Sequence, residues 1–484
     1  MNGGGIDLIA LAREAMAAKG FRPDLPAEAL AQAARATPRE DPGTRDLRGL
    51  LWSSIDNDSS KDLDQVEYAE AAPGGRIRVR IGIADVDALA AKDTPVDRHA
   101  ADQTVSIYAH SQVFPMLPER LSTDLSSLNE GQERLAMVSD LLVDSSGEVV
   151  ESEFYPARVI NRAKLTYGRV GAWLEGRGPA PDAFAAHPGL ERQVRLQDEA
   201  ASALRAARER RGALRFARTE TQFVMEGGRV KGFAAARKTR AAELIEDFML
   251  ASNQAMARAL REFGCWSIRR VVEAPRRWDR IVAIAQSLGA TLPAQADVRA
   301  LSRFLDEQQA KNPSGFQELS LSVLKLLGPG EYAVEPPTDT EPDHFSLAAL
   351  DYTHSTAPNR RYADLVTQRM LKAALRRDSA PPYSEQELTA AARRCTLQED
   401  QARKVERLMD KRIAAMALAD NVGEQFEAAV TGVNDKGTFV RVLNPPADGR
   451  LFAGAEGADV GDHIRVKLMR VDVRLGHVDF ARVA

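Results

Sequence analysis

Hydrophobic residues recur at helical spacing at the start of the chain and then give way to a polar stretch. IDLIALAREAM and LPAEALAQAARA predict two helices within residues 6–36, with Lys19-Gly20 between them and Pro26 near the start of the second. TPREDPGTRD then has the composition of a linker. We therefore expect a short helical N-terminal unit over residues 1–45. A helix-turn-helix-like unit and a simple helical lead-in both fit this pattern.

From about residue 48 the pattern changes to short apolar or alternating runs, which indicate strands. These runs are LLWSSI (50–55), QVEYAE (65–70) and RIRVRIGIADV (76–86), and Pro73-Gly74-Gly75 marks a turn before the third. Long Ala- and Arg-rich segments predict helices over 187–211, 240–263, 360–377 and 385–420. Residues 221–235 predict a two-stranded element that turns at Gly227-Gly228. Residues 46–422 thus read as one large mixed α+β domain.

The end of the chain alternates strand and turn instead. Five short apolar runs follow one another between residues 425 and 484, with Lys436-Gly437 at the first turn. Short strands at this spacing are typical of a small barrel. We expect residues 423–484 to form a separate five-stranded barrel.

Composition narrows the class of protein. The chain has 484 residues, 44% apolar and 28% charged, which suits a globular protein of several domains. It contains no run of eighteen apolar residues, and its start does not resemble a secretion signal. Two cysteines, Cys265 and Cys395, cannot build a disulfide framework or a zinc site. By elimination we expect a cytoplasmic protein without a membrane partner.

Charge is distributed unevenly along the chain, although the net charge is only −4. Residues 201–240 hold eleven Lys or Arg against three Glu, and residues 353–413 hold thirteen Lys or Arg against eight Asp or Glu. This segregation suits a basic channel inside an acidic shell, as in a nucleic-acid-binding protein. Solvated helix faces explain it equally well, so charge alone leaves both interpretations open.

The segment SIDNDSSKDLDQVEYAE is rich in carboxylates directly after a predicted strand. Residues two apart in extended backbone face the same way, so Asp62 and Asp64 share one side. The loop before them can bring Asp56 alongside. Three converging carboxylates without a balancing base need a cation, and oxygen ligands select Mg²⁺ or Mn²⁺.

Such ions suit phosphodiester hydrolysis, because they orient the phosphate, help to generate hydroxide and neutralise the leaving oxygen. A calcium-binding loop fits less well, since the run from Asp56 to Ser60 lacks the third ligand and the central glycine. An acidic surface turn is the other alternative.

The acidic segment resembles the catalytic signature of the ribonuclease II family, in which four aspartates follow a strand as D-x5-D-x-D-D. Asp56, Asp62 and Asp64 match the first three, and Gln65 stands at the fourth position. Three later segments resemble family motifs in the same order: IGIADV (81–86), SIYAHSQVFPMLPERLSTDLSSLN (106–129) and HFSLAALDYTHSTAPNRRYADL (344–365). The last has Ala357 and Asn359 in place of the usual Ser and Ile. The likeness covers about residues 48–420.

The resemblance implies a two-metal enzyme that degrades RNA from its 3′ end and releases nucleoside 5′-monophosphates. It implies that Asp56, Asp62 and Asp64 bind Mg²⁺ or Mn²⁺, with Asp64 indispensable for catalysis. Gln65 offers an amide oxygen where the family has a carboxylate. We expect Gln65 to ligate a metal or to hold a metal-bound water, with lower metal affinity because one charge is missing.

The resemblance also implies residues that hold RNA. Tyr108 matches a tyrosine against the 3′-terminal nucleotide, and Phe216 matches an aromatic that stacks on the terminal bases from the other side. Arg360 matches the arginine on the scissile or adjacent phosphate, where it could stabilise the transition state. Glu246 matches a glutamate near the terminal sugar, and Arg361 is a second candidate for contact with RNA.

Structural roles are the alternatives for three of these residues. Phe216 would then be a core residue, Glu246 a charge on a helix surface and Arg361 the ion-pair partner of Asp364.

The two ends of the chain add further expectations. Residues 423–484 resemble an S1-type RNA-binding OB-fold, with Phe439 as a stacking residue. The family usually has cold-shock OB-folds before the catalytic domain, and about 45 residues cannot hold one beside a linker. A wider approach to the catalytic channel and tolerance of structured RNA are the hypotheses that follow.

The leading interpretation is thus a monomeric 3′-to-5′ exoribonuclease that acts on single-stranded RNA ends. A catalytically weakened RNA-binding protein with the same fold is the first alternative, and Gln65 is the feature that favours it. A deoxyribonuclease is the second, since only contact with the 2′-hydroxyl would exclude DNA.

Overall fold

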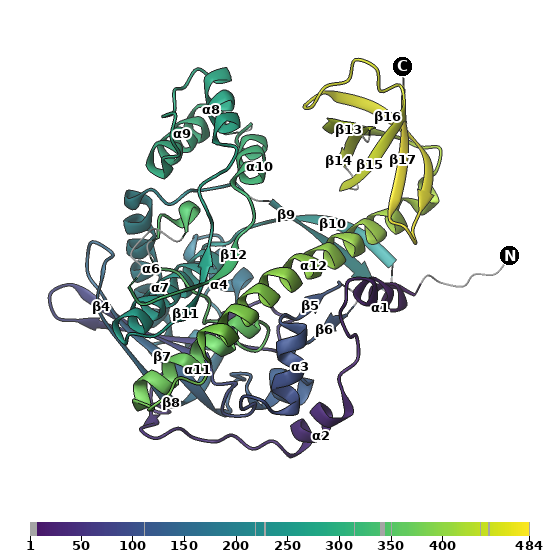
Figure 1. Cartoon of the computed structure of the whole chain (residues 1–484). Coiled ribbons are helices and arrows are strands. Elements are labelled where there is room, and N and C mark those ends of the chain that lie inside the picture. Colours follow the sequence, from purple (N-terminus) through teal and green to yellow (C-terminus); the bar gives the residue numbers. More distant parts are fainter. Residues whose placement is uncertain are drawn as a thin grey trace.

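The computed structural model describes residues 7–483, apart from residues 111, 218, 227–228, 314, 339–343, 350, 436 and 444–445. Figure 1 shows a large mixed body, a small barrel at the C-terminal end and a long helix, α12 (Glu385–Leu418), that runs across the body toward the barrel. The predicted α+β class and the five-stranded barrel are confirmed.

A six-stranded mixed sheet lies in the large body. Its strands are β1 (Arg45–Asp46), β2 (Trp52–Asp56), β3 (Gln65–Ala72), β4 (Arg76–Ala84), β7 (Glu133–Val143) and β8 (Val149–Thr166). The strand order is β1-β8-β2-β3-β4-β7, and β7 also pairs with β8, so the sheet curls back on itself. The three strands predicted from alternation, β2, β3 and β4, are neighbours in this order.

Alternation in β4 explains how one face of the sheet enters the core. Ile77, Val79 and Ile81 are buried on that face. The arginines between them are partly exposed, and Arg80 pairs with Asp140 of β7 at 2.8 Å. The strand therefore places apolar side chains inward and charged ones outward, as a half-buried strand requires.

Helices pack against the buried face of the sheet and share one hydrophobic cluster with it. They include α6 (Leu190–Arg211), α7 (Arg240–Glu262) and α11 (Tyr362–Arg376), close to the predicted ranges. Phe248 of α7 and Leu365 of α11 are fully buried in this cluster together with Ile55 of β2. The end of β2, where the acidic segment begins, is thus anchored in the main core.

Three further helices, which we did not predict, form a satellite unit. They are α8 (Trp278–Ser287), α9 (Val298–Lys311) and α10 (Phe316–Leu327), and Trp278, Leu301 and Phe304 pack in a cluster of their own. The predicted two-stranded element is present as β9 (Thr219–Glu226) and β10 (Arg229–Arg237). Its predicted turn residues lie outside the described residues.

The N-terminal helices are α1 (Leu8–Ala18) and α2 (Ala27–Arg35), as expected. They join different clusters: Leu11 and Met16 of α1 pack with Val405 of α12, whereas Ala29 and Ala33 of α2 enter the main core. The two helices thus contribute to different cores, and the helix-turn-helix-like alternative stays a prediction.

The C-terminal barrel closes in the order β13-β14-β15-β17-β16. Its strands are β13 (Gln425–Asn434), β14 (Gly437–Leu443), β15 (Pro446–Ala453), β16 (His463–Asp472) and β17 (His477–Arg482). Leu418 at the end of α12 packs into the barrel's cluster with Val440 and Phe480, so the barrel rests on the long helix. No helix in the described parts of the chain has the length and apolar character needed to cross a membrane.

Candidate active site

The acidic segment is a loop that connects two core strands. β2 ends at Asp56 and β3 begins at Gln65. Ser127 holds the middle of the loop, because its hydroxyl accepts from the Leu63 amide at 2.9 Å and donates to the Lys61 carbonyl at 2.8 Å. The motif at 106–129 therefore fixes the shape of the acidic loop.

Asp64 lies at the centre of the site and is 4% exposed. Its carboxylate accepts a hydrogen bond from the backbone amide of Asn359 at 3.1 Å and another from Nε of Arg360 at 3.3 Å. Burial raises the pKa of Asp64 to about 7; the Arg360 guanidinium opposes this rise and the charge of Asp62 adds to it. The motif at 344–365 thus supplies both partners of the predicted catalytic aspartate.

Asp62 faces Tyr108 on the same side of the site. The Tyr108 hydroxyl donates to the Asp62 carboxylate at 3.3 Å, and its ring is partly exposed. Burial raises the pKa of Asp62, while Arg360 opposes the shift and Asp56 reinforces it. Glu406 of α12 accepts from the Tyr108 backbone amide at 3.1 Å and so positions the tyrosine. Asp62 and Asp64 of the acidic loop are therefore brought together with Tyr108 and Arg360, so the site draws on three separate segments of the chain.

Asp56 and Gln65 flank the loop. The Asp56 carboxylate accepts hydrogen bonds from the backbone amide of Asn57 at 2.7 Å and from the Ser60 hydroxyl at 2.9 Å. The buried Gln65 amide donates to the Ile55 carbonyl at 3.4 Å, which holds its side chain against the end of β2.

Glu67 is a neighbour of this site that the sequence did not lead us to predict. It is fully buried, and burial followed by the charge of Asp56 raises its pKa well above the ordinary value. It could have been found from the strand period, because Gln65 and Glu67 project from the same face of β3.

Arg360 and Arg361 have different surroundings. The Arg360 side chain is 46% exposed beside Asp64, so part of the side chain is open to a ligand. Arg361 instead donates two hydrogen bonds to the buried Asp364 carboxylate, at 2.9 and 2.7 Å. This contact is the structural pair that was the alternative for Arg361.

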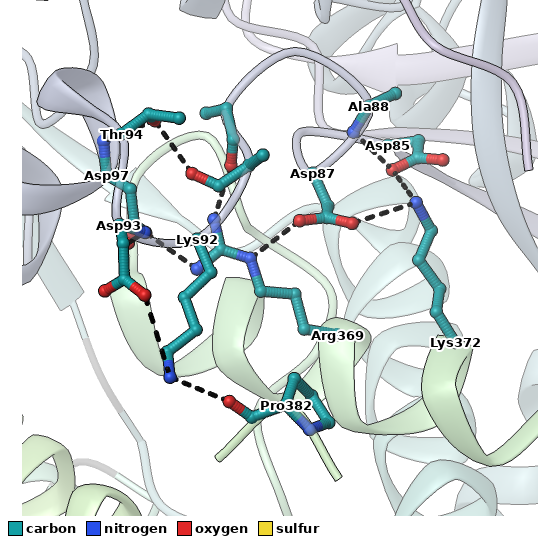
Figure 2. Close-up of polar contacts among 12 residues, drawn as sticks. Asp85, Asp87, Ala88, Lys92, Asp93, Thr94, Asp97, Arg369, Lys372 and Pro382 are labelled. Carbon is teal, nitrogen blue, oxygen red and sulfur yellow. Dashed lines mark hydrogen bonds and ion pairs between the residues drawn. The ribbon is translucent and has the colours of Figure 1, made fainter. Parts of the chain in front are cut away.

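A buried ion-pair network anchors α11, the helix that follows Arg360 (Figure 2). Lys372 contacts Asp85 at 2.6 Å and Asp87 at 3.5 Å, and Arg369 contacts Asp87 at 2.7 Å. Arg369 also binds Asp97 of α3 (Pro95–Gln103) at 2.7 Å. Asp85 of the IGIADV segment and Asp87 just after it therefore hold α11 through Lys372 and Arg369.

Phe216 and Glu246, two residues predicted to contact RNA, make contacts with other parts of the protein. Phe216 is partly buried against the cluster of the satellite helices around Trp278. Glu246 is exposed on α7 and pairs with Lys238. Asp410 binds the His110 ring at 2.5 Å. These contacts agree with the structural alternatives for Phe216 and Glu246, and their roles toward RNA stay predictions.

The carboxylates of the loop suit a hard divalent cation in their chemistry. Asp56, Asp62 and Asp64 offer oxygen donors only, and Glu67 adds two carboxylate oxygens without a hydrogen-bond partner among the described residues. As they stand, the described Asp, Glu, His and Cys side chains form no group of three that encloses a metal ion. The individual ligands therefore remain predictions.

Comparison with known proteins places these segments in a family. Residues 44–377 match the RNB domain, and residues 424–483 match the RNase II-type exonuclease C-terminal S1 domain. The chain is 29% identical over 483 residues to Ribonuclease R of Vibrio cholerae, covering 91% of this chain and 57% of that protein. It spans less than two thirds of the length of this relative and of the next three.

Solved structures agree on the fold. Mycoplasma genitalium RNase R, in complex with ribose-methylated single-stranded RNA, matches with a TM-score of 0.87 at 21% identity, over 99% of this chain and 78% of that one. Yeast Ssd1, described as a pseudonuclease, matches with a TM-score of 0.69 at 16% identity, over 92% of this chain and 56% of that one. The RNB domain match covers well over half of this chain. The chain therefore belongs to the RNB domain family, with an RNase II-type S1 domain at its C-terminal end.

Proposed function

We propose that this protein is a 3′-to-5′ exoribonuclease that hydrolyses single-stranded RNA to nucleoside 5′-monophosphates with the help of divalent cations. The observation that carries the proposal is a pair of hydrogen bonds at one site: Arg360 donates to Asp64, and Tyr108 donates to Asp62. An acidic centre, a half-exposed guanidinium and a partly exposed aromatic ring are what cleavage at an RNA end requires.

Each group has a distinct task in this proposal. Asp56, Asp62 and Asp64 would hold Mg²⁺ or Mn²⁺, with Gln65 as a further oxygen donor, and the metal would supply an activated water and charge neutralisation. Arg360 would bind the phosphate next to the cleaved bond through its exposed guanidinium. The Tyr108 ring would stack on the 3′-terminal base, an interaction that accepts any base and is worth about 1–3 kcal/mol.

The surroundings of the site support the same assignment. Asp64 is buried while Arg360 and Tyr108 are partly exposed, so the side chains that would touch RNA lie on the solvent side of the acidic centre. An S1-type barrel that rests on α12 would guide RNA toward it. RNase R from Mycoplasma genitalium, whose fold this chain shares, was solved with single-stranded RNA. A cytoplasmic monomer remains the expected form.

A catalytically weakened RNA-binding protein is the second candidate. Gln65 favours it because an amide replaces a carboxylate in the acidic set. The likeness in fold to a pseudonuclease also means that the fold alone does not decide between the two.

One digestion separates these candidates. RNA and DNA oligonucleotides labelled at the 5′ end are incubated with the protein and Mg²⁺, with Asp64→Asn as the matched variant. A ladder that shortens from the 3′ end of RNA, in the unsubstituted protein alone, supports the exoribonuclease. Intact RNA that is still bound supports the second candidate, and equal digestion of DNA would make the protein a general exonuclease.

A further inference from the structure

Glu67 is a buried acid beside the acidic loop, and its carboxylate has no hydrogen-bond partner in the part of the chain that the structure describes. Its side chain is 0% exposed, and neither carboxylate oxygen has a hydrogen-bond partner among the described residues. An ionised carboxylate in such a position is costly, because it has lost water and gained nothing in exchange. A proton or a cation must therefore neutralise it.

The strand register places Glu67 beside the metal-binding end of the sheet. Gln65 and Glu67 project from one face of β3, and Glu67 is opposite Ser53 of β2. The Gln65 amide contacts the Ile55 carbonyl, so this face of β3 borders the last residues of β2 before Asp56. The Ser53 hydroxyl is likewise buried without a partner among the described residues.

We propose that Glu67 supplies the negative charge that Gln65 lacks and holds a divalent cation together with Asp56, directly or through a metal-bound water. This inference rests on the proposed metal-dependent function. It moves one carboxylate two residues along the strand, about 7 Å. A glutamate is one methylene longer than an aspartate, and Mg²⁺ keeps several of its waters, so side-chain length and a bridging water both shorten the gap to the cation.

Metal binding without turnover tests this role. Mn²⁺ affinity is measured from the electron paramagnetic resonance signal of the free ion, on the full chain. Glu67→Gln should weaken binding by about 10- to 100-fold. Adding Gln65→Asp to that variant should restore most of the affinity. In EDTA the Tm of Glu67→Gln should equal or exceed that of the unsubstituted protein, because an uncharged amide removes the buried charge.

Glu70→Gln is the matched control on the same strand. The Glu70 carboxylate already binds Arg80 at 2.9 Å and Tyr68 at 3.2 Å, so its loss should leave Mn²⁺ affinity unchanged. Equal affinity in Glu67→Gln and the unsubstituted protein would overturn the inference, since Glu67 would then simply be protonated. If Glu67→Gln fails to fold, Gln65→Asp alone decides: little change in affinity supports compensation by Glu67, and a gain of about tenfold or more refutes it.

Failure of the inference is distinguishable from failure of the proposed function. If the unsubstituted protein digests RNA but Glu67→Gln leaves its Mn²⁺ affinity unchanged, only the inference about Glu67 is wrong. If Mn²⁺ binding depends on Glu67 but the protein digests no RNA, only the proposed exoribonuclease activity is wrong. A protein that binds no Mn²⁺ overturns both.

Discussion

Two adjacent arginines at the site have separate tasks. Arg360 lies half exposed beside Asp64, whereas Arg361 is committed to the buried Asp364. Asp364 also accepts from the Ala357 amide at 2.8 Å, so the Arg361 pair shapes the turn that presents Arg360. Arg360 thus keeps part of its side chain exposed beside Asp64, while Arg361 holds the backbone of the turn.

Substitution of each arginine by methionine should separate these tasks. Arg360→Met should lower kcat by about 10²- to 10³-fold with little change in Tm, as expected when a transition-state contact is lost. Arg361→Met should cost about 3–5 kcal/mol of stability, because Asp364 is left buried and unpaired. Urea unfolding and RNA digestion measure the two effects. A reversed pattern would contradict the assignment.

The raised pKa of Asp64 predicts a pH dependence. Its native pKa of about 7 lies above the unfolded value of 3.8, so between these values the native state holds more protons than the unfolded state. The free energy of unfolding in EDTA should therefore fall as pH rises from about 4 to 7. Mg²⁺ binds the ionised form, so the Tm increase on adding Mg²⁺ should be larger at pH 8 than at pH 6. A larger increase at pH 6 would rule out this acidic site as the metal site.

Residue identity alone predicted part of the site. The spacing of Asp62 and Asp64 and the family motifs led to Tyr108 and Arg360, which the fold brings to the same place. Glu67 was missed because its interest lies in complete burial without a partner among the described side chains, which is a property of the folded core. The packing of Phe216 also depends on distant helices, so a short motif could not reveal it.

At the scale of elements, the network under α11 is what holds Arg360 in place. Lys372 is 3% exposed and contacts Asp41 and Asp85, each at 2.6 Å. These carboxylates come from the N-terminal linker and from the residue after β4. The helix is therefore fixed through buried charge, and Arg360 lies two residues before its first residue, Tyr362.

Lys372→Met should release this helix. Three buried or nearly buried carboxylates, Asp41, Asp85 and Asp87, lose their shared cation, so we expect a loss of about 3–5 kcal/mol and reduced digestion. Lys92→Met is the control, because Lys92 is more exposed and pairs with the half-exposed Glu387. Its effect should stay below about 1 kcal/mol. Urea unfolding compares the two, and equal losses would mean that the network is not an anchor.

Elements with a strong period were predictable, and elements without one were not. β2, β3 and β4 were found because their faces alternate or are wholly apolar, and α7 and α11 because their segments are long and rich in Ala and Arg. Both helices pack on that sheet. The satellite helices α8 to α10 were not predicted. Their apolar residues pack on one another rather than on the sheet, so their place depends on tertiary contacts.

At the scale of the whole molecule, α12 joins three parts of the chain. Arg412, buried on this helix, donates to the Arg474 carbonyl of the barrel and to the Leu11 carbonyl of α1, each at 2.8 Å. Figure 1 shows α12 extending from the body to the barrel. The barrel is therefore held in a fixed position relative to the body that contains the site.

Arg412→Met should loosen this junction. Two carbonyls lose their donor, which should cost about 1–3 kcal/mol and speed proteolysis between residues 419 and 424. Arg403→Met is the matched control on α12, since its partner Glu399 keeps Arg270. It should change stability by no more than about 0.5 kcal/mol. An unchanged proteolysis rate for Arg412→Met would show that the barrel is held by other contacts.

The central claim is that this site removes nucleotides from the 3′ end of RNA with a metal bound at the acidic loop. Its most direct test is a single-turnover reaction on RNA labelled at the 3′-terminal nucleotide, with product identification, in Mg²⁺ and in EDTA. We predict release of a labelled nucleoside 5′-monophosphate in Mg²⁺ only, reduced by about 100-fold or more in Asp64→Asn, which should still bind RNA. Labelled RNA that stays intact, or label released first in longer fragments, would contradict the account.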